Sequence, residues 1–552
     1  MPAWLRTLSM TALLVFLLGG VALALGPGDL DPSFGGGRVT VPFGGEAGAS
    51  GIAVAPGGKV VVAGYSEAMP GFVVARLLPD GSPDPSWGKA GVVNTPLGES
   101  SYSADVAVQS DGKVIAVGEA NEDFAIVRYL ENGELDPSFG EGGVVIMPVG
   151  TFENYAYAVA LGPDGLIAVT GVANVSEEPR VLGAGVAVLK SNGEPETSFS
   201  ADGRTIVTTE SEGDDRGEGI AVDEDGRIVI ADSTGGGAGD GFTIVRLGTD
   251  GEPDGSFAGD GIVETPIPGE GEVTGGRSTD VTIQPDGKIV AGGYGVDYTG
   301  PPGEQEYLTK FTLVRYLADG ELDTSFGKGG IASARPGVGD DFGRAVALSA
   351  DGKLILGGSY DHNPAPLEEN PAPALLRFNS DGSLDPSFGS GGIILGSFPA
   401  GIEYESLEGM ALQADGRVLT SATASPGSGP ESAVVSRYLV AQPPGPPPGP
   451  PAEPSNAFRF GKVKRNTKAG TAKLTVKVPG PGTLWMRGHG VLTQHRVPSQ
   501  RGTLELLIKS KGEAKRKLDT VGKVLIRLKV TFTPDGGAPL TRVKRIKLVE
   551  AA

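Results

Sequence analysis

The chain repeats one short motif seven times along most of its length. The motif reads Leu or Pro, then Asp, any residue, Ser, Phe and Gly, with small variations. Its copies occupy residues 30–35, 83–88, 135–140, 195–199, 253–257, 322–327 and 384–389. A repeat at this spacing predicts similar structural units that bury their apolar faces against one another.

Each unit also contains a predicted β-hairpin. In the second unit, residues 106–108 and 113–118 read as two strands around an Asp-Gly turn at 111–112, and this dipeptide supplies the positive φ angles that a tight hairpin needs. A third strand ends in Arg, or in Lys190 in one unit, and a fourth short strand follows the Phe-Gly element. The Arg residues are Arg76, Arg128, Arg246, Arg315, Arg377 and Arg437. Four antiparallel strands per unit are typical of a propeller blade.

The order of the motifs predicts how the ring closes. The first Phe-Gly element and its strand at 38–41 precede the first hairpin, and the last unit ends near Leu439 with no such element after it. The N-terminal strand is therefore free to complete the last blade. We predict an all-β chain with a seven-bladed β-propeller over residues 28–440, closed by this strand.

The three recurring elements resemble the delta-60 repeat family of bacterial β-propellers and, more distantly, NHL-type propellers. The resemblance covers about residues 30–439 and departs from the pattern at Trp87, Leu166, Lys190 and Glu196. It implies a propeller fold and carries no general biochemical activity.

Residues present in every unit are interpreted as scaffold. The repeated Asp and Ser flank a turn in which side-chain oxygens bond backbone amides, and the Phe or Trp supplies a large apolar group. The repeated Arg is expected to reach a carboxylate of its own or of the next blade. Asp223–Gly226 comes nearest to a calcium loop, but calcium needs about six to eight oxygen ligands, so a hairpin turn is the better interpretation.

One column of residues is expected to crowd the central axis just before each inner strand. It reads Gly51, Asp105, Ala158, Gly219, Asp280, Ala345 and Gly409. Asp105 and Asp280 interrupt the small residues, and further candidates for an acidic, aromatic-rimmed mouth are Tyr102, Tyr157, Glu218, Asp341, Arg344, Tyr404 and Glu405. Such a mouth would suit a cation, a basic peptide or a sugar. The alternative is a solvated channel entrance without a ligand.

The two ends of the chain predict export and a second domain. Residues 1–24 have one Arg, an apolar run and a small-x-small site, which is typical of a cleaved secretory signal peptide; an uncleaved anchor is the alternative. Residues 441–454 are a Pro-rich linker. Residues 455–552 carry 22 Lys and Arg against 5 Asp and Glu, net +17, whereas the whole chain has net charge −21. Alternating strands there predict a basic Ig-like β-sandwich.

The chemistry available is limited. The chain has no Cys, which excludes disulfides, Cys-bound zinc and thiol nucleophiles. His362, His489 and His495 have no metal-site spacing, so no cofactor or metal is expected.

We predict a non-catalytic binding module, secreted or in the cell envelope. An unknown ligand or protein partner would bind at the propeller loop face. Anionic envelope polymers, or the acidic propeller itself, would bind the basic domain, with no nucleic acid partner and no membrane span after signal cleavage. The alternatives are a propeller hydrolase or lyase that uses the acidic mouth, and a structural spacer in the envelope.

Overall fold

A computed structural model describes residues 25–550, except 99, 179, 210–213, 234–240, 270–274, 300–305, 362–370, 397–400 and 441–454. The chain forms two compact units, residues 1–443 and 444–552. The predicted signal peptide, the predicted linker and His362 lie outside the described residues. No helix in the described part is long and apolar enough to cross a membrane.

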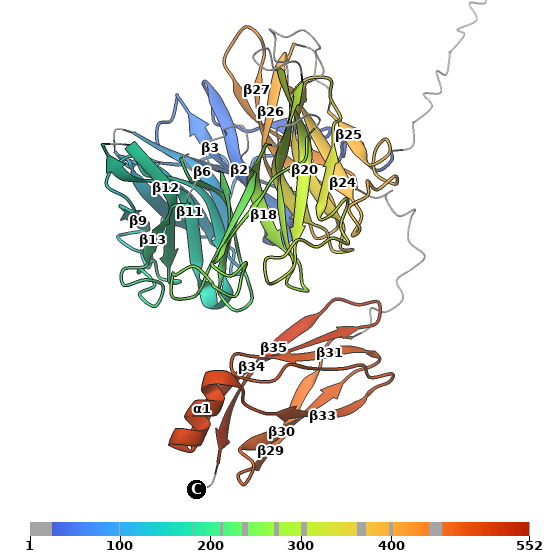
Figure 1. Ribbon diagram of the computed structural model, residues 1–552. Helices are drawn as coiled ribbons and strands as arrows, with labels where there is room; N and C mark the ends of the chain where they lie inside the picture. The colour runs from blue at the N-terminus through green and yellow to red at the C-terminus, as the bar shows by residue number, and fades with distance from the viewer. Residues whose placement is uncertain are drawn as a thin grey trace, which may run out of the picture. The chain divides into compact units, whose positions relative to one another are not determined.

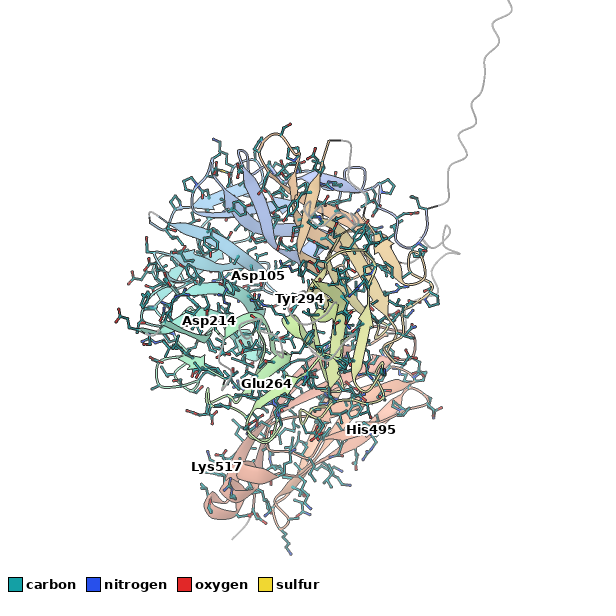
Figure 2. All side chains as sticks on the ribbon, turned by 45° about the horizontal axis from the view of Figure 1, so that its top comes forward. Asp105, Asp214, Glu264, Tyr294, His495 and Lys517 are labelled. Carbon is teal, nitrogen blue, oxygen red and sulfur yellow. The ribbon has the colours of Figure 1, made fainter. Side chains whose placement is uncertain are left out.

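The first unit consists of four-stranded antiparallel sheets arranged side by side around an axis (Figures 1 and 2). Seven such sheets are described, and we number them along the chain. Sheets one to three contain β2 (Ala47–Ala55), β3 (Lys59–Ser66), β4 (Phe72–Leu77) and β5 (Val92–Thr95); β6 (Ser101–Val108), β7 (Val114–Ala120), β8 (Asp123–Tyr129) and β9 (Val144–Met147); and β10 (Tyr155–Leu161), β11 (Ile167–Glu177), β12 (Arg180–Leu189) and β13 (Arg204–Val207).

Sheets four to seven follow the same plan. They contain β14 (Arg216–Val222), β15 (Ile228–Ser233), β16 (Phe242–Leu247) and β17 (Ile262–Thr265); β18 (Gly276–Ile283), β19 (Ile289–Thr299), β20 (Glu306–Tyr316) and β21 (Ile331–Ala334); β22 (Asp341–Leu348), β23 (Leu354–Asp361), β24 (Pro371–Phe378) and β25 (Ile393–Leu395); and β26 (Tyr404–Leu412), β27 (Val418–Ser425), β28 (Ser432–Tyr438) and β1 (Arg38–Thr40). The hairpin turns of sheets one and three are short 3-10 turns, Pro56–Gly58 and Pro163–Gly165, and the second of these contains the Asp-Gly pair Asp164-Gly165.

The first strand of the chain completes the last sheet, as the motif order predicts. β1 pairs antiparallel with β28, and Val39 lies opposite Val435. The innermost strand of each sheet also contacts the innermost strands of both neighbouring sheets, β26 and β2 included. Residues near the two ends of the first unit therefore belong to one sheet.

Apolar clusters hold neighbouring sheets together. Between sheets one and two, Val61 and Val74 pack with Val114 and Val127. The same kind of cluster joins sheet seven to sheet one, where Val435 packs among residues of β3 and β4. Burial of each such side chain contributes about 1.5–3 kcal/mol. Because the clusters lie between the sheets, each sheet depends on its neighbours for its core.

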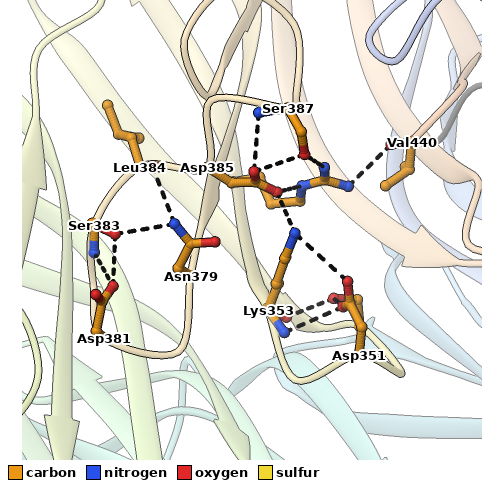
Figure 3. A network of polar contacts seen from close by, with 11 residues as sticks. Asp351, Lys353, Asn379, Asp381, Ser383, Leu384, Asp385, Ser387 and Val440 are labelled. Carbon is orange, nitrogen blue, oxygen red and sulfur yellow. Dashed lines mark hydrogen bonds and ion pairs between the residues drawn. The ribbon is translucent and has the colours of Figure 1, made fainter.

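The repeated motif forms a polar clamp, which Figure 3 shows in sheet six. Nε of Arg377 lies 2.7 Å from Oδ2 of Asp385, and Nζ of Lys353 lies 2.7 Å from the same oxygen. Ser387 donates to Oδ1 of Asp385 from its backbone N (3.0 Å) and its Oγ (2.7 Å). A second guanidinium nitrogen of Arg377 donates to the carbonyl oxygen of Val440, which follows β28 of sheet seven, at 3.0 Å. The clamp therefore joins one sheet to the next.

Six of the seven sheets carry this clamp. The other five ion pairs are Arg76–Asp84, Arg128–Asp136, Arg246–Asp254, Arg315–Asp323 and Arg437–Asp31. In all six sheets the guanidinium lies 4.4–4.7 Å over the ring of the motif's Phe or Trp. This confirms that the repeated Arg reaches a motif carboxylate, and it adds the carbonyl oxygen of the neighbouring sheet as a second partner.

Sheet three lacks the clamp. Lys190 stands in place of Arg and pairs with Glu194 at 3.7 Å. Glu196 replaces the Asp and accepts hydrogen bonds from Ser198. Leu166 replaces the cation that follows the hairpin turn in the other six sheets. Three of the four departures seen in the sequence, Leu166, Lys190 and Glu196, thus coincide in sheet three, whereas Trp87 belongs to the intact clamp of sheet one.

The second unit has two antiparallel sheets with a shared apolar core. One sheet has the order β29-β30-β33 and the other β32-β31-β34-β35. The strands are β29 (Arg459–Asn466), β30 (Thr471–Val478), β31 (Gly482–Arg487), β32 (Gln494–Arg496), β33 (Gly502–Ile508), β34 (Lys523–Pro534) and β35 (Leu540–Val549). The helix α1 (Gly512–Val521) buries Leu518 in that core. Every second residue of β34 enters the core, as the alternating sequence predicts.

Candidate functional site

A β-bulge shapes each innermost strand at the same position. The pairing with the second strand shifts register there in all seven sheets. The axial column therefore lies within the innermost strands, and its expected place just before them is wrong. Alternation alone does not reveal a bulge, because the bulge adds one residue to one strand only.

Asp105 and Asp280 link neighbouring sheets at the axis. Asp105 accepts hydrogen bonds from the backbone N of Val106 (2.7 Å) and from that of Val159 in sheet three (3.0 Å). Asp280 accepts from Val281 (2.8 Å) and from Val346 in sheet six, also at 2.8 Å. Figure 2 labels Asp105 near the centre of the ring. Both carboxylates are thus bound by protein donors.

Burial raises the pKa of both carboxyl groups despite these bonds. The pKa of Asp105 is raised to about 6, and that of Asp280 to about 7, where the charge of Asp105 adds a smaller contribution. A Cβ added at Gly51 would lie 2.6 Å from Cα of Asp105, and one at Gly219 would lie 2.6 Å from Cα of Asp280. The glycines of the column are therefore required by the close approach of the next strand.

Aromatic and charged side chains gather where the innermost strands begin. Glu218 and Arg277 form an ion pair of 2.6 Å between sheets four and five. Burial and the charge of Glu218 raise the pKa of Tyr157, and burial and the charge of Tyr157 raise that of Tyr102. Burial alone would lower the pKa of Arg277, but Glu218 and Tyr294 raise it. Three predicted residues, Tyr102, Tyr157 and Glu218, therefore belong to one connected group.

This group includes residues that sequence reasoning missed. Tyr294 lies opposite Arg277 in the pairing of β18 with β19, and its ring meets that of Phe342 edge-on at 5.0 Å. Tyr155 also adds to the electrostatic environment of Tyr102. The sequence position could have identified several of them, because Tyr102, Tyr155, Arg277 and Phe342 each lie three residues before a residue of the axial column. We call Tyr102, Tyr155, Tyr157, Glu218, Arg277, Tyr294 and Phe342 the aromatic arc.

The other predicted site residues divide into exposed and buried ones. Arg344 is exposed and Tyr404 is partly exposed at the start of β26. Asp341 and Glu405 are buried, at 0% and 1% exposure. Glu405 pairs with Arg38, and Oδ2 of Asp341 accepts a hydrogen bond from the backbone N of Gly337 at 3.0 Å. Both side chains are thus buried within the protein and do not line an exposed mouth.

Asp341 occupies a position whose side chain accepts a hydrogen bond from the segment that connects one sheet to the next. In sheet three, Asn154 takes the same place and accepts a bond from the backbone N of Gly150 at 2.8 Å. In sheet four, Asp215 accepts one from that of Thr209 at 2.7 Å. Buried backbone amides need such partners, which accounts for a polar side chain there. Burial raises the pKa of Asp341 to about 7.

Asp232 replaces a glycine of the repeat. At the equivalent positions of five sheets a Cβ would lie 1.9–2.0 Å from a carbonyl oxygen of the innermost strand; these glycines are Gly64, Gly118, Gly171, Gly293 and Gly358. Asp232 is fully buried, and burial together with the charge of Asp215 raises its pKa well above the ordinary value. Its Oδ1 accepts from the backbone N of Arg216 at 2.8 Å. Sheet four, which contributes Glu218 to the aromatic arc, therefore has a buried carboxyl group where five other sheets have a glycine.

A partly open cavity lies at the opposite end of the innermost strands. It has a volume of about 490 Å³ and is lined by the turn Pro56–Gly58 and by Gln109, Gln413 and Asp415. No predicted site residue lines it. Within the described ranges, no three His, Asp or Glu side chains are grouped so as to hold a metal ion.

A family model describes four stretches of the chain. It is a β-propeller domain of unknown function, DUF5122, and it matches residues 56–86, 109–139, 284–326 and 349–388. These stretches cover the hairpin turn, the second and third strands and the Asp-x-Ser-Phe motif of sheets one, two, five and six. The chain is a β-propeller repeat protein. No curated protein matches its sequence.

Several solved structures are similar to the propeller at low sequence identity. Virginiamycin B lyase from Staphylococcus aureus is 14% identical, with 73% of this chain and 98% of the lyase covered and a TM-score of 0.40. The polysaccharide lyase Uly1 is 10% identical, with 73% and 91% covered and a TM-score of 0.41. The GH93 α-L-arabinofuranosidase of Fusarium graminearum is 10% identical, with 60% and 91% covered and a TM-score of 0.36. At these values, none of the three activities is assigned to this propeller.

Proposed function

We propose that the protein is an exported, non-catalytic binding module of the cell envelope. Residues 1–24 act as a cleaved signal peptide, and the seven sheets form a closed seven-bladed propeller. The Pro-rich linker at 441–454 joins it to an Ig-like sandwich, which attaches the chain to anionic polymers of the envelope.

The aromatic arc is the proposed ligand site of the propeller. Its support is the connected set of Tyr157, Glu218, Arg277 and Tyr294, which combines ring faces with a paired charge at one end of the axis. Aromatic faces with a few polar groups are typical of sites for sugars and peptides. Arg344 and Tyr404 extend this site along the rim.

The hydrogen bonds of the two axial carboxylates favour a binding function over a catalytic one. Asp105 and Asp280 each accept two backbone N–H groups, one of them from the next sheet. A carboxylate with this role acts as a structural link, whereas a general acid or base must reach a substrate atom. We therefore assign Asp105 and Asp280 to the scaffold of the site.

A binding survey tests the proposal. The chain from residue 25 onward is applied to an array of glycans and cell-wall fractions, alongside the double variant Tyr157→Ala/Glu218→Gln. The matched control is Tyr65→Ala/Glu431→Gln, which removes a Tyr–Glu hydrogen bond of 3.1 Å elsewhere on the propeller. We expect the first variant to lose at least about tenfold in affinity for the ligand found and the control to lose less than twofold. Equal losses of affinity in the two variants would show that the aromatic arc is not the binding site. If the wild type bound no ligand on the array, the proposed function would be refuted.

A further inference from the structure

We propose that the outer face of the sheet β31-β34-β35 in the second unit binds an acidic polysaccharide. This deepens the envelope association proposed above, and it rests on that function only in taking the chain to be exported. The face consists of the odd-numbered residues of three adjacent strands. The even-numbered residues, such as Met486, Leu528 and Ile546, fill the core on the other side.

Cations dominate this face. They are Arg487 on β31, Lys523, Arg527 and Lys529 on β34, and Arg545 and Lys547 on β35. No Asp or Glu occurs anywhere on these three strands. Neighbouring strands lie about 4.8 Å apart and alternate residues about 6.8 Å apart, so the six charges share one face of the sheet.

The register places like charges directly opposite one another. Arg487 lies opposite Lys529, and Arg527 lies opposite Arg545. Like charges in this position destabilise a sheet. A row of anionic groups is attracted to such a face, and the planar guanidinium group binds carboxylates and phosphates through two N–H groups at once. The register itself therefore points to an extended polyanion as the partner.

An aromatic surface adjoins the cations. The rings of Trp485 and His495 stack at 4.8 Å, and the guanidinium of Arg487 lies 4.9 Å from the centre of the Trp485 ring. Leu525 is 64% exposed and Val543 is 45% exposed among the charges. Sugar rings have apolar faces as well as polar groups, so a charged polysaccharide matches this mixture of aromatic, apolar and cationic side chains.

The test compares two pairs of substitutions in the chain from residue 25 onward. Arg527→Gln/Arg545→Gln removes two charges from the proposed face. Lys464→Gln/Lys477→Gln removes two exposed charges from β29 and β30 in the other sheet. Affinity is measured at low salt for polygalacturonate, for neutral dextran, for polyphosphate and for single-stranded DNA, and thermal unfolding verifies that each variant is folded.

We expect tight binding of polygalacturonate that weakens with salt, and no binding of dextran. The arginine variant should lose at least about tenfold in affinity for polygalacturonate and the lysine variant less than about twofold. Equal losses would show that net charge, and not this face, binds the polymer. In that case attachment to the envelope, the proposed function, would still stand.

A third variant tests the choice of a polysaccharide over other polyanions. Trp485→Ala should weaken polygalacturonate binding more than polyphosphate binding, because only the sugar polymer has a ring face to contact. An equal effect on both, or tighter binding of single-stranded DNA than of polygalacturonate, would overturn the assignment. If the wild type also failed to bind any envelope fraction, the proposed function would fail with it.

Discussion

Sheet three and the other six sheets of the propeller differ at one junction. Six sheets present a buried Arg to a motif Asp, to a Ser and to a carbonyl oxygen of the next sheet. Sheet three presents Lys190, Glu196 and Leu166 at the equivalent positions. It still buries Phe199 and still pairs β12 with β13. The apolar contacts therefore suffice to form a blade, and the clamp supplies additional stability between blades.

The clamp at the closing sheet should have the largest effect. Arg437 is 1% exposed and binds Asp31, which lies 406 residues earlier in the chain. Arg437→Ala removes the nearer of the two cations that face the buried Asp31 and leaves Arg417 at 3.3 Å; the loss of one partner of a buried ion pair costs up to about 3–5 kcal/mol. Denaturant unfolding measures this loss. Lys190→Ala in sheet three is the matched control, and it should cost less than about 0.5 kcal/mol; similar losses for both would contradict a special role for the clamp.

Acid should weaken the six clamps together. Burial alone would raise the pKa of Asp136, but hydrogen bonds from Ser138 and the charges of Lys113 and Arg128 lower it well below its usual value. A lowered folded-state pKa gives stability that is present above the unfolded pKa of about 4 and is lost as the pH falls below it. Unfolding free energy measured from pH 6 to pH 2 should fall steeply below about pH 4. A flat profile there would refute the clamps as a major source of stability.

The axial carboxyl groups should act in the opposite direction. The pKa of Asp105 is raised to about 6 and that of Asp280 to about 7. A raised folded-state pKa means that the folded protein holds the proton longer, so stability falls as the pH rises from about 4 to about 7. The melting temperature should therefore decrease between pH 5 and pH 8.

The double variant Asp105→Ala/Asp280→Ala isolates this contribution. Between pH 5 and pH 8 the unfolding free energy of this variant should fall less than that of the wild type. The difference should be about 1 kcal/mol, because solvent screening reduces the effect of the raised pKa values. It should also be less stable at pH 5, because two hydrogen-bonded links between sheets are lost. An unchanged pH dependence would show that other groups cause the decrease.

Installing the missing clamp should have the smallest effect. The triple variant Leu166→Lys/Lys190→Arg/Glu196→Asp gives sheet three the residues found in the other sheets. We expect a gain of about 1 kcal/mol in unfolding free energy, because a buried, hydrogen-bonded ion pair repays much of its desolvation cost. Thermal unfolding against the single Leu166→Lys variant measures it. A loss of stability would show that the surroundings of sheet three have adapted to its own residues.

The sequence predicted the scaffold well because the scaffold repeats. Seven copies of one motif defined the strands, the turns and the pairing of the N-terminal strand with β28. The role of the repeated Arg was also predictable, since a buried cation needs a carboxylate and the motif supplies one. The carbonyl partner in the next sheet was not, because it depends on how two sheets stack.

The candidate site was predicted less well, because it depends on departures from the repeat. Alternation did not reveal the bulge that places Asp105 within a strand. Asp341 and Glu405 looked exposed because charged residues usually are, yet Asp341 is buried as the acceptor of a backbone N–H and Glu405 is buried as the partner of Arg38. Arg277 and Tyr294 became recognisable only from two contacts: the pairing of β18 with β19 brings Tyr294 opposite Arg277, and Arg277 pairs with Glu218 of sheet four.

The central claim is that the repeated Arg–Asp clamp is a stabilising bond between blades, and hydrogen exchange measured sheet by sheet tests it most directly. Exposed or weakly held strands exchange their amide protons faster. Under native conditions, the amides of β12 and β13 in sheet three should exchange faster than those of β8 and β9 in sheet two, which carries the clamp. Equal or slower exchange in sheet three would contradict the claim.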